Sequence, residues 1–414
     1  MTQVLPLRNI RIIDFTMGWA GPLATRHLAD MGAEVIKIES CTHMDWWRGW
    51  DNTPEMIAAR EYEKQPIFNV TNRNKLGVAI DLTLPKGRDL ALRLVERADA
   101  VIENQATGVM KKLGLSYDDL RVVNKEIIML SLPAFGVAGP WGGYRGYGST
   151  VEHASGLPHL SGEPDGPPMQ THVAYGDACG GMNAGAALLV GLFHRKKTGK
   201  GQRIDISQVE GLHQLGVHGS IEQSLTGQAP KRMGSRHPVF VPHGIFACAD
   251  PDSWLVVTVT NEEEWSALCE AIGRSDLRKD SSLSSWEGRQ AQQAMIESAI
   301  SSWTIRFTNE EGMQVLQAAG VPAAAVLRST DLSSDEGLVE REFWKKIDRQ
   351  LVGRKSHPLT PWMVNGERAE IRWPAPLLGQ HNKKVLHEIL GMSEQEILNL
   401  AKNKVIGEVP QFDS

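Results

Sequence analysis

The feature that most constrains the fold of this chain is a repeated alternation of short apolar strands and amphipathic helices. A strand at 11–15 leads through a Gly-Pro turn into a helix that Pro22 opens. Because strands joined through helices pair in parallel, the pattern predicts an α/β fold with a parallel sheet covered by helices. Ligands bind beyond the carboxyl ends of such strands, where Glu39, Asn104 and residues 133–136 fall. The predicted segments are strands at 11–15, 34–39, 100–103 and 126–132 and helices at 22–30 and 86–98.

The pattern of predicted strands and helices changes near Gly227, which predicts a second, smaller α+β domain after a large first one. With 414 residues and 41% hydrophobic content, the chain is long enough for two domains. Residues 136–176 are rich in Gly and Pro with little periodicity, so we expect a functional loop there. The later predicted segments are strands at 202–207, 254–259 and 321–326 and helices at 177–192, 208–225, 262–272, 285–319 and 383–390.

Composition and local motifs exclude several classes of protein. The net charge is −5 and no basic block stands out, so nucleic-acid binding is not expected. The four cysteines are scattered without a CxxC pair, which argues against disulfides and zinc and favours a cytoplasmic protein. The first nine residues lack the apolar stretch of a signal peptide, and no run of about 18 apolar residues predicts a membrane span. His153, His159 and His172 lack ligand spacing, so no metal is expected.

An acid at the start of a small-residue helix is the strongest candidate for chemistry. Asp177 lies in the run Tyr175–Gly181 and is followed by a segment that is apolar on nearly every side, which predicts a buried helix. Free backbone N–H groups and the helix dipole are expected to keep this carboxylate ionised at neutral pH, ready to act as a nucleophile or base. The ordinary alternative is an N-cap, since Asp is a favoured capping residue.

Two further sets of residues are open to a structural and a functional interpretation. Six basic side chains follow strands or lie in loops; solvated surface is the usual fate of such residues, and a scattered phosphate-binding set is the alternative. Three tryptophans crowd around Arg48 on a probable loop, where they favour packing or ligand binding over free exposure. The basic residues are Lys37, Arg48, Arg73, Lys75, Lys112 and Arg145, and the tryptophans are Trp46, Trp47 and Trp50.

Taken in order, the short motifs of the chain resemble those of the family III CoA-transferases, a group that includes formyl-CoA transferase and the carnitine CoA-transferases. Each motif alone is weak, but their order and spacing extend over nearly the whole chain. The matching motifs are Ala20-Gly21-Pro22, residues 28–39 (LADMGAEVIKIE), Asn72-Arg73-Asn74-Lys75, residues 79–82, Glu103-Asn104, Leu113-Gly114, residues 136–140, Gly176-Asp177, residues 195–205 (RKKTGKGQRID), residues 319–322 and Pro376-Leu377-Leu378-Gly379.

The resemblance implies a fold, a nucleophile and a CoA site. It implies a Rossmann-like large domain made of both chain ends (1–225 and 331–414), a small domain at 226–330, and two subunits interlocked as a homodimer or with a paralogous partner. Asp177 is then the nucleophile, coenzyme A the co-substrate and no metal is needed. The implied CoA contacts are Trp19, Ala20, Ile80, Asp81, Asn104, Lys112, Arg145 and Tyr147, and the implied substrate contacts are Met17 and Trp50.

Departures from the formyl enzyme bear on specificity. Met17 and Trp19 stand where that enzyme has His and Gln, Ser40 replaces an arginine, and residues 234–244 lack its glycine-rich loop. Bulky apolar side chains around the site favour a larger acid than oxalate, for example a substituted succinate with succinyl-CoA as donor. Two alternatives remain: an α-methylacyl-CoA racemase, for which the expected His-Asp pair is absent from residues 144–149, and a CoA-binding subunit of a hetero-oligomeric transferase.

Overall fold

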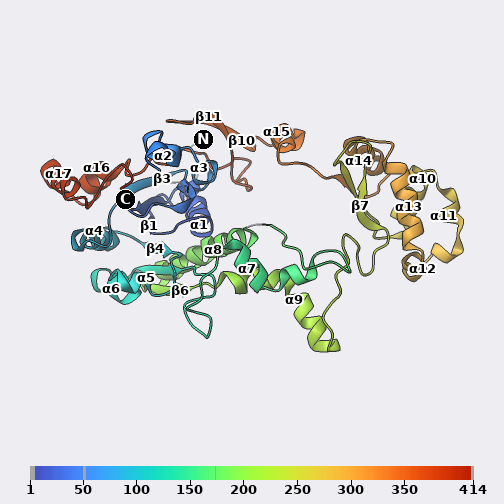
Figure 1. Cartoon of the computed structure of the whole chain (residues 1–414), viewed down its shortest axis with the longest axis horizontal. Coiled ribbons are helices and arrows are strands. Elements are labelled where there is room, and N and C mark those ends of the chain that lie inside the picture. The colour runs from blue at the N-terminus through green and yellow to red at the C-terminus, as the bar shows by residue number, and fades with distance from the viewer. Residues whose placement is uncertain (1–4, 50–52, 173, 412–414) are drawn as a thin grey trace. The chain divides into compact units, whose positions relative to one another are not determined.

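The computed structural model describes residues 5–49, 53–172 and 174–411, and the chain divides into two compact units (Figure 1). The first unit comprises residues 1–157, 170–220 and 337–414, so it is built from both ends of the chain. The second comprises residues 158–169 and 221–336. The α/β character predicted from the alternating pattern is confirmed in the first unit, which contains a parallel sheet and its covering helices.

The sheet of the first unit has six strands in the order β3-β2-β1-β4-β5-β6, and every neighbouring pair is parallel. This is the strand order of doubly wound dinucleotide-binding folds, in which ligands lie beyond the carboxyl ends of the strands. The strand β3 was missed by the sequence analysis because its segment KLGVA contains a lysine and a glycine. The strands are β1 (Arg11–Asp14), β2 (Glu34–Glu39), β3 (Lys75–Ala79), β4 (Ala100–Glu103), β5 (Ile128–Ser131) and β6 (Gln202–Asp205).

Each face of this sheet is covered by its own hydrophobic cluster. On one face α1 (Ala20–Asp30) and α8 (Tyr175–Thr198) pack Leu28 and Leu188 against strand residues such as Ile12 and Ile102. On the other, α4 (Pro85–Glu96) packs Leu90 and Leu94 on the sheet, together with helices from the C-terminal segment. The remaining helices of this unit are α2 (Pro54–Ala58), α3 (Pro66–Thr71), α5 (Val109–Lys112), α6 (Tyr117–Val123), α7 (Gly148–Ala154), α9 (Gln208–Thr226, shared with the second unit), α15 (Glu336–Glu340), α16 (Asn382–Lys384), the π-helix Val385–Ile389 and α17 (Glu394–Lys402).

The helix α8 differs from its sequence prediction in two ways. It begins at Tyr175 and continues through Thr198, whereas the predicted helix ended at residue 192. Only one of its faces is buried, against α1 and the sheet, whereas Met182, Val190 and Phe193 on the other side are 50%, 69% and 64% exposed. The expectation of a helix buried all round was therefore wrong for the single chain.

The second unit holds a three-stranded antiparallel sheet with helices and a separate core. Trp265, Leu268 and Trp303 are among its buried side chains. In the first unit, by contrast, two features were not predicted from the sequence: the hairpin of β10 (Trp344–Arg349) and β11 (Gly353–Pro358), and the helix α17. No helix within the described ranges is long and apolar enough to cross a membrane. The elements of the second unit are β7 (His243–Ala247), β8 (Trp254–Thr258), β9 (Ala323–Ala325), α10 (Glu262–Ala271), α11 (Ser275–Lys279), α12 (Trp286–Ala291), α13 (Gln293–Thr304) and α14 (Asn309–Ala318).

Candidate active site

The carboxylate of Asp177 lies where the N-termini of three helices converge. Asp177 is the third residue of α8, whose N-cap is Ala174, so it is not the capping residue of its helix. Two backbone N–H groups from other helices donate toward its carboxylate, those of Ala20 and Gly148. Ala20 is the first residue of α1 and Gly148 the first of α7. Since N–H groups in a first helical turn lack partners within their own helix, the convergence forms an anion site.

Burial nevertheless determines the sign of the pKa shift. The pKa of Asp177 is raised from 3.8 to about 6, chiefly because the carboxylate is withdrawn from water, and the two N–H groups offset only part of this cost. The sequence predicted that free N–H groups at the start of its own helix would stabilise the anion. The two N–H groups that contact the carboxylate come instead from α1 and α7, and the N–H of Ala178 is bonded to Ala174. At pH 7 a group with this pKa is still mostly ionised and available as a nucleophile.

Gly148 leaves the space that the carboxylate occupies. A Cβ atom at this position would lie 2.3 Å from Oδ2 of Asp177 and 2.7 Å from Cα of Ala174. The glycine therefore does two things: it offers its N–H and it allows the close approach. Gly148 was not among the predicted site residues, because no local signal distinguishes it from the other glycines of residues 136–176.

Two pairs of aromatic side chains include the residues that precede Ala20 and Gly148 in the chain, and we call these pairs the aromatic wall. The rings of Trp19 and Trp47 lie 5.5 Å apart, and those of Trp46 and Tyr147 lie 4.8 Å apart. Trp19 precedes Ala20, and Tyr147 precedes Gly148, so both pairs flank the residues that donate to Asp177. His172, which the sequence analysis considered only as a metal ligand, has its ring 6.0 Å from that of Trp19. Trp50, predicted as a substrate contact, lies outside the described residues.

A pocket of about 210 Å³ lies beyond the carboxyl ends of β1, β2 and β3. Met17, Ile80 and Asp81 line it, so three residues with predicted ligand contacts come together there. Asn104 connects this pocket to the loop after β1, because its side-chain amide accepts from the N–H of Met17 at 2.9 Å and donates to the Met17 carbonyl at 2.8 Å. Apolar walls from Phe15, Ile38, Leu82, Met110 and Leu113 suit a flat, partly apolar group.

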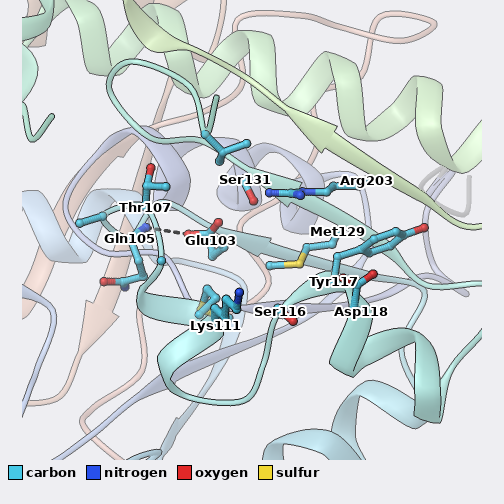
Figure 2. A pocket seen from close by; sticks show the side chains of 14 residues that line it. Glu103, Gln105, Thr107, Lys111, Ser116, Tyr117, Asp118, Met129, Ser131 and Arg203 are labelled. Atoms are coloured by element: carbon cyan, nitrogen blue, oxygen red, sulfur yellow. Dashed lines mark hydrogen bonds between the residues drawn. The ribbon is translucent and has the colours of Figure 1, made fainter. Parts of the chain in front are cut away.

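A second pocket, of about 300 Å³, lies on the other side of α5 (Figure 2). Figure 2 shows Lys111 from α5 and Arg203 from β6 reaching toward Glu103 at the end of β4. Glu103 accepts from the N–H of Gln105 at 2.8 Å, and burial raises the pKa of its carboxyl. The charges of this pocket are mixed, with Asp118 also on its wall, so they select no single class of ligand.

Four of the six basic residues singled out in the sequence are wholly buried, so neither surface solvation nor phosphate binding describes them. Lys37 and Lys75 pair with Asp45 at 2.8 Å and with Asp14 at 3.1 Å. Arg48 and Arg73 pair with Glu39 and Asp30, both at 2.8 Å. The other two, Lys112 and Arg145, are exposed. Among the described residues no group of three or more His, Cys, Asp or Glu side chains is placed to hold a metal ion.

Comparisons with known proteins place the whole chain in one family. The model of CoA-transferase family III matches residues 7–382. A succinyl-CoA–D-citramalate CoA-transferase of Chloroflexus aurantiacus is 30% identical over 403 residues, which cover 97% of this chain and 98% of that protein. A succinate–glutarate CoA-transferase of Agrobacterium fabrum is 31% identical and covers 93% and 96% of the two chains. A crystal structure of a CaiB/BaiF family protein from Brucella suis superposes with a TM-score of 0.83 at 28% identity, covering 94% of this chain and all of the other.

Proposed function

The chain belongs to CoA-transferase family III and is a CoA-transferase, and we propose that Asp177 is its nucleophile. The observation that carries the proposal is the position of that carboxylate, partly withdrawn from water and facing the N–H groups of Ala20 and Gly148. We further propose succinyl-CoA as donor and a substituted or longer dicarboxylic acid as acceptor. Two observations support this choice: the names of the two relatives, and the wall of Trp19 and Trp47, which favours acids with apolar bulk.

The reaction proceeds through four acyl transfers at one carboxylate. Asp177 attacks the thioester carbonyl of the donor, forming a mixed anhydride and releasing the CoA thiolate. The thiolate attacks the aspartyl carbonyl, which gives an aspartyl-CoA thioester and frees the donor acid. The acceptor carboxylate then attacks this thioester, forming a second anhydride and the thiolate, which takes the new acyl group and restores Asp177. Every step exchanges one activated acyl group for another, so no ATP is consumed.

The residues around Asp177 have assignable roles in this scheme. The N–H groups of Ala20 and Gly148 donate to the carbonyl oxygen on which negative charge develops. The pocket with Ile80 and Asp81 accepts the nucleotide end of CoA, and Trp19, Ala20, Asn104 and Tyr147 line the path of its pantetheine arm to Asp177. Lys112 and Arg145 supply exposed positive charge for the phosphates, and Trp50 contacts the acyl group. Met17, predicted as an acyl contact, instead lines the pocket that accepts the nucleotide end.

The exposed apolar residues of α8 and α9 support an oligomer. Val190 and Phe193 on α8 and Leu215 on α9 are 69%, 64% and 46% exposed in the single chain. Exposed apolar surface of this kind marks a contact with another protein. We propose that a second copy, or a paralogous subunit, covers these helices.

The test is CoA exchange by the purified chain. Succinyl-CoA is mixed with citramalate, glutarate, oxalate or formate, and the acyl-CoA products are separated by mass spectrometry. We expect new thioesters of the bulkier acids and an aspartyl hydroxamate at residue 177 when hydroxylamine is added. Asp177→Ala should form neither product. An unmodified Asp177 in a fully inactivated enzyme would exclude the covalent route.

The same assay in deuterated solvent separates this activity from its alternatives. A racemase would place solvent deuterium on the α-carbon of the acyl group, and a transferase would not. If the purified chain exchanges no CoA until a paralogous subunit is added, it is the CoA-binding subunit of a hetero-oligomer.

A further inference from the structure

The loop between β1 and α1 is held by two buried side chains that come from elsewhere in the sequence. Lys37, on β2, donates to the carbonyl oxygen of Thr16 at 2.7 Å. Asp45 accepts from the N–H of Gly18 at 2.9 Å. The ammonium and the carboxylate pair with each other at 2.8 Å, and neither side chain is exposed. One ion pair therefore fixes both ends of the segment 16–18.

Asp45 also fixes the aromatic wall. The carboxylate oxygen that accepts from Gly18 accepts from the N–H of Trp47 at 3.0 Å. Trp46 closes over Gly18, since a Cβ atom on that glycine would lie 2.2 Å from the indole nitrogen. Asp45 thus ties the segment 16–18 to Trp47, whose ring lies beside that of Trp19.

The backbone of this segment is held by side chains. Asn104 bonds both the N–H and the carbonyl of Met17, between the bonds that Lys37 and Asp45 make to Thr16 and Gly18. Asp14 adds a further bond, accepting from the N–H of Thr16 at 2.9 Å. A loop held in this way is rigid before any ligand arrives, and rigid placement of donors is what electrostatic catalysis requires. The segment leads directly through Trp19 to Ala20, whose N–H faces Asp177.

We propose that Asp45 and Lys37 are positioning residues, which act through the segment 16–18 to hold the Ala20 N–H against the Asp177 carboxylate. This inference rests on the proposed role of Asp177 as nucleophile. A buried ion pair is by itself weak evidence for a contribution to stability. The bonds to Thr16 and Gly18 are what assign this pair a role at the site.

The test compares Asp45→Asn and the charge-free double variant Lys37→Met/Asp45→Asn with a matched control. The control is Asp30→Asn, because Asp30 pairs with Arg73 at 2.8 Å in an equally buried site at the opposite end of α1. The double variant leaves no unpaired buried charge, so it remains informative if the single variant does not fold.

We expect both test variants to lower kcat about tenfold or more while KM for succinyl-CoA changes less than about threefold. The acid limb of the kcat/KM profile, which reports the pKa of Asp177 in the free enzyme, should move upward by about half a pH unit or more, since the Ala20 N–H no longer favours the ionised form of Asp177. Asp30→Asn should lower the melting temperature and leave the limb in place. The inference is wrong if a folded test variant keeps the wild-type limb, or if Asp30→Asn moves it equally.

A second arm needs no enzyme activity. Adding Asp177→Asn should raise the melting temperature at pH 7.5 by more in the Asp45→Asn or double background than in the wild type, because loss of the Ala20 donor makes the buried carboxylate more costly. An equal increase in all backgrounds would overturn the positioning role even if the chain transferred no CoA. Absence of transfer by the wild type, with this arm positive, would instead count against the proposed function.

Discussion

A single methyl group on α8 should impair the site without touching a reacting atom. Gly181 lies one turn beyond Asp177, and a Cβ atom there would be 2.5 Å from the carbonyl oxygen of Ala20 and 3.1 Å from the side chain of Leu23. Gly185 lies one turn further along α8, and its Cβ would be 4.0 Å from Ala24, an ordinary contact. Gly181→Ala and Gly185→Ala are therefore the same substitution on the same helix, with and without a clash.

The size of the effect follows from these distances. To accept Gly181→Ala, α8 and the start of α1 must separate by about 0.5 Å, because carbon–oxygen contacts below 3.0 Å are not tolerated in a packed interior. That movement withdraws the Ala20 N–H from Asp177. Overpacking costs about 1–3 kcal/mol of stability, and misplacement of this order lowers rates by about 10- to 100-fold. Gly185→Ala should instead gain about 0.5–1 kcal/mol from helix propensity.

The assay is kcat for CoA exchange with succinyl-CoA, together with the melting temperature of each variant. We expect Gly181→Ala to lose about tenfold or more in kcat and Gly185→Ala to stay within about twofold of the wild type. Equal activity in the two variants would refute the argument that the α1–α8 approach sets the geometry at Asp177. Equal loss in both would do the same, since only one substitution creates a clash.

Three further outcomes are expected. As the proposed nucleophile, Asp177 has to be ionised to attack. Because its pKa in the free chain is about 6, kcat/KM for the acyl-CoA donor should be constant above neutral pH and fall about tenfold per pH unit below 6; a flat profile down to pH 5 would contradict this. Trp19→Ala should lower kcat/KM for a bulky acceptor about tenfold or more, because apolar contact area is lost, while binding of succinyl-CoA measured by calorimetry changes less; oxalate as the best acceptor of the wild type would contradict the apolar pocket. Lys112→Ala and Arg145→Ala should each weaken CoA binding by about 1–3 kcal/mol, and unchanged dissociation constants would show that these side chains are only solvated.

The architecture could be predicted because it depends on local patterns. The strands at 34–39 and 100–103 were placed with the bounds of β2 and β4, since each is a short apolar run bounded by turns. The start of α1 was placed two residues late because Pro22 was taken as its first position, whereas the helix begins at Ala20. That difference matters for function, since it is the first N–H of the helix that faces Asp177.

The buried charges could not be predicted from local patterns. Lys75 is separated from Asp14 by 61 positions, and Glu63 from Arg349 by 286. A basic residue is buried only when a distant partner compensates the loss of water, and a sequence window contains no information on that partner. The same limit applies to Asp177: its position was predicted, but the donors on α1 and α7, and the burial that raises its pKa, belong to tertiary structure.

The burial of Asp177 also has a consequence for stability. Its pKa is about 6 in the folded chain and 3.8 when freely solvated, so the folded state holds the proton more tightly. The free energy of unfolding then decreases as pH rises from about 4 to 6, because Asp177 loses its proton at a lower pH in the unfolded chain than in the folded one. Above pH 7, burial of the ionised carboxylate lowers the free energy of unfolding by about 3 kcal/mol. The proposed role of Asp177 accounts for this cost, since a carboxylate that acts as nucleophile has to be ionised.

Asp177→Asn removes the charge and keeps the shape, so it should abolish transfer and stabilise the fold. Part of the gain is offset, since an amide offers only one oxygen to the N–H groups of Ala20 and Gly148. We expect the melting temperature at pH 7.5 to rise by about 1–2 °C, which corresponds to a net gain of about 1 kcal/mol in a unit of this size. At pH 5 the wild-type carboxyl is already largely protonated in the folded state, and the cost of burying it is about 1.4 kcal/mol lower than at pH 7.5, so the net gain of Asp177→Asn should disappear. A lower melting temperature for Asp177→Asn at pH 7.5 would mean that the N–H groups outweigh burial, and the raised pKa would then be the wrong description of this site.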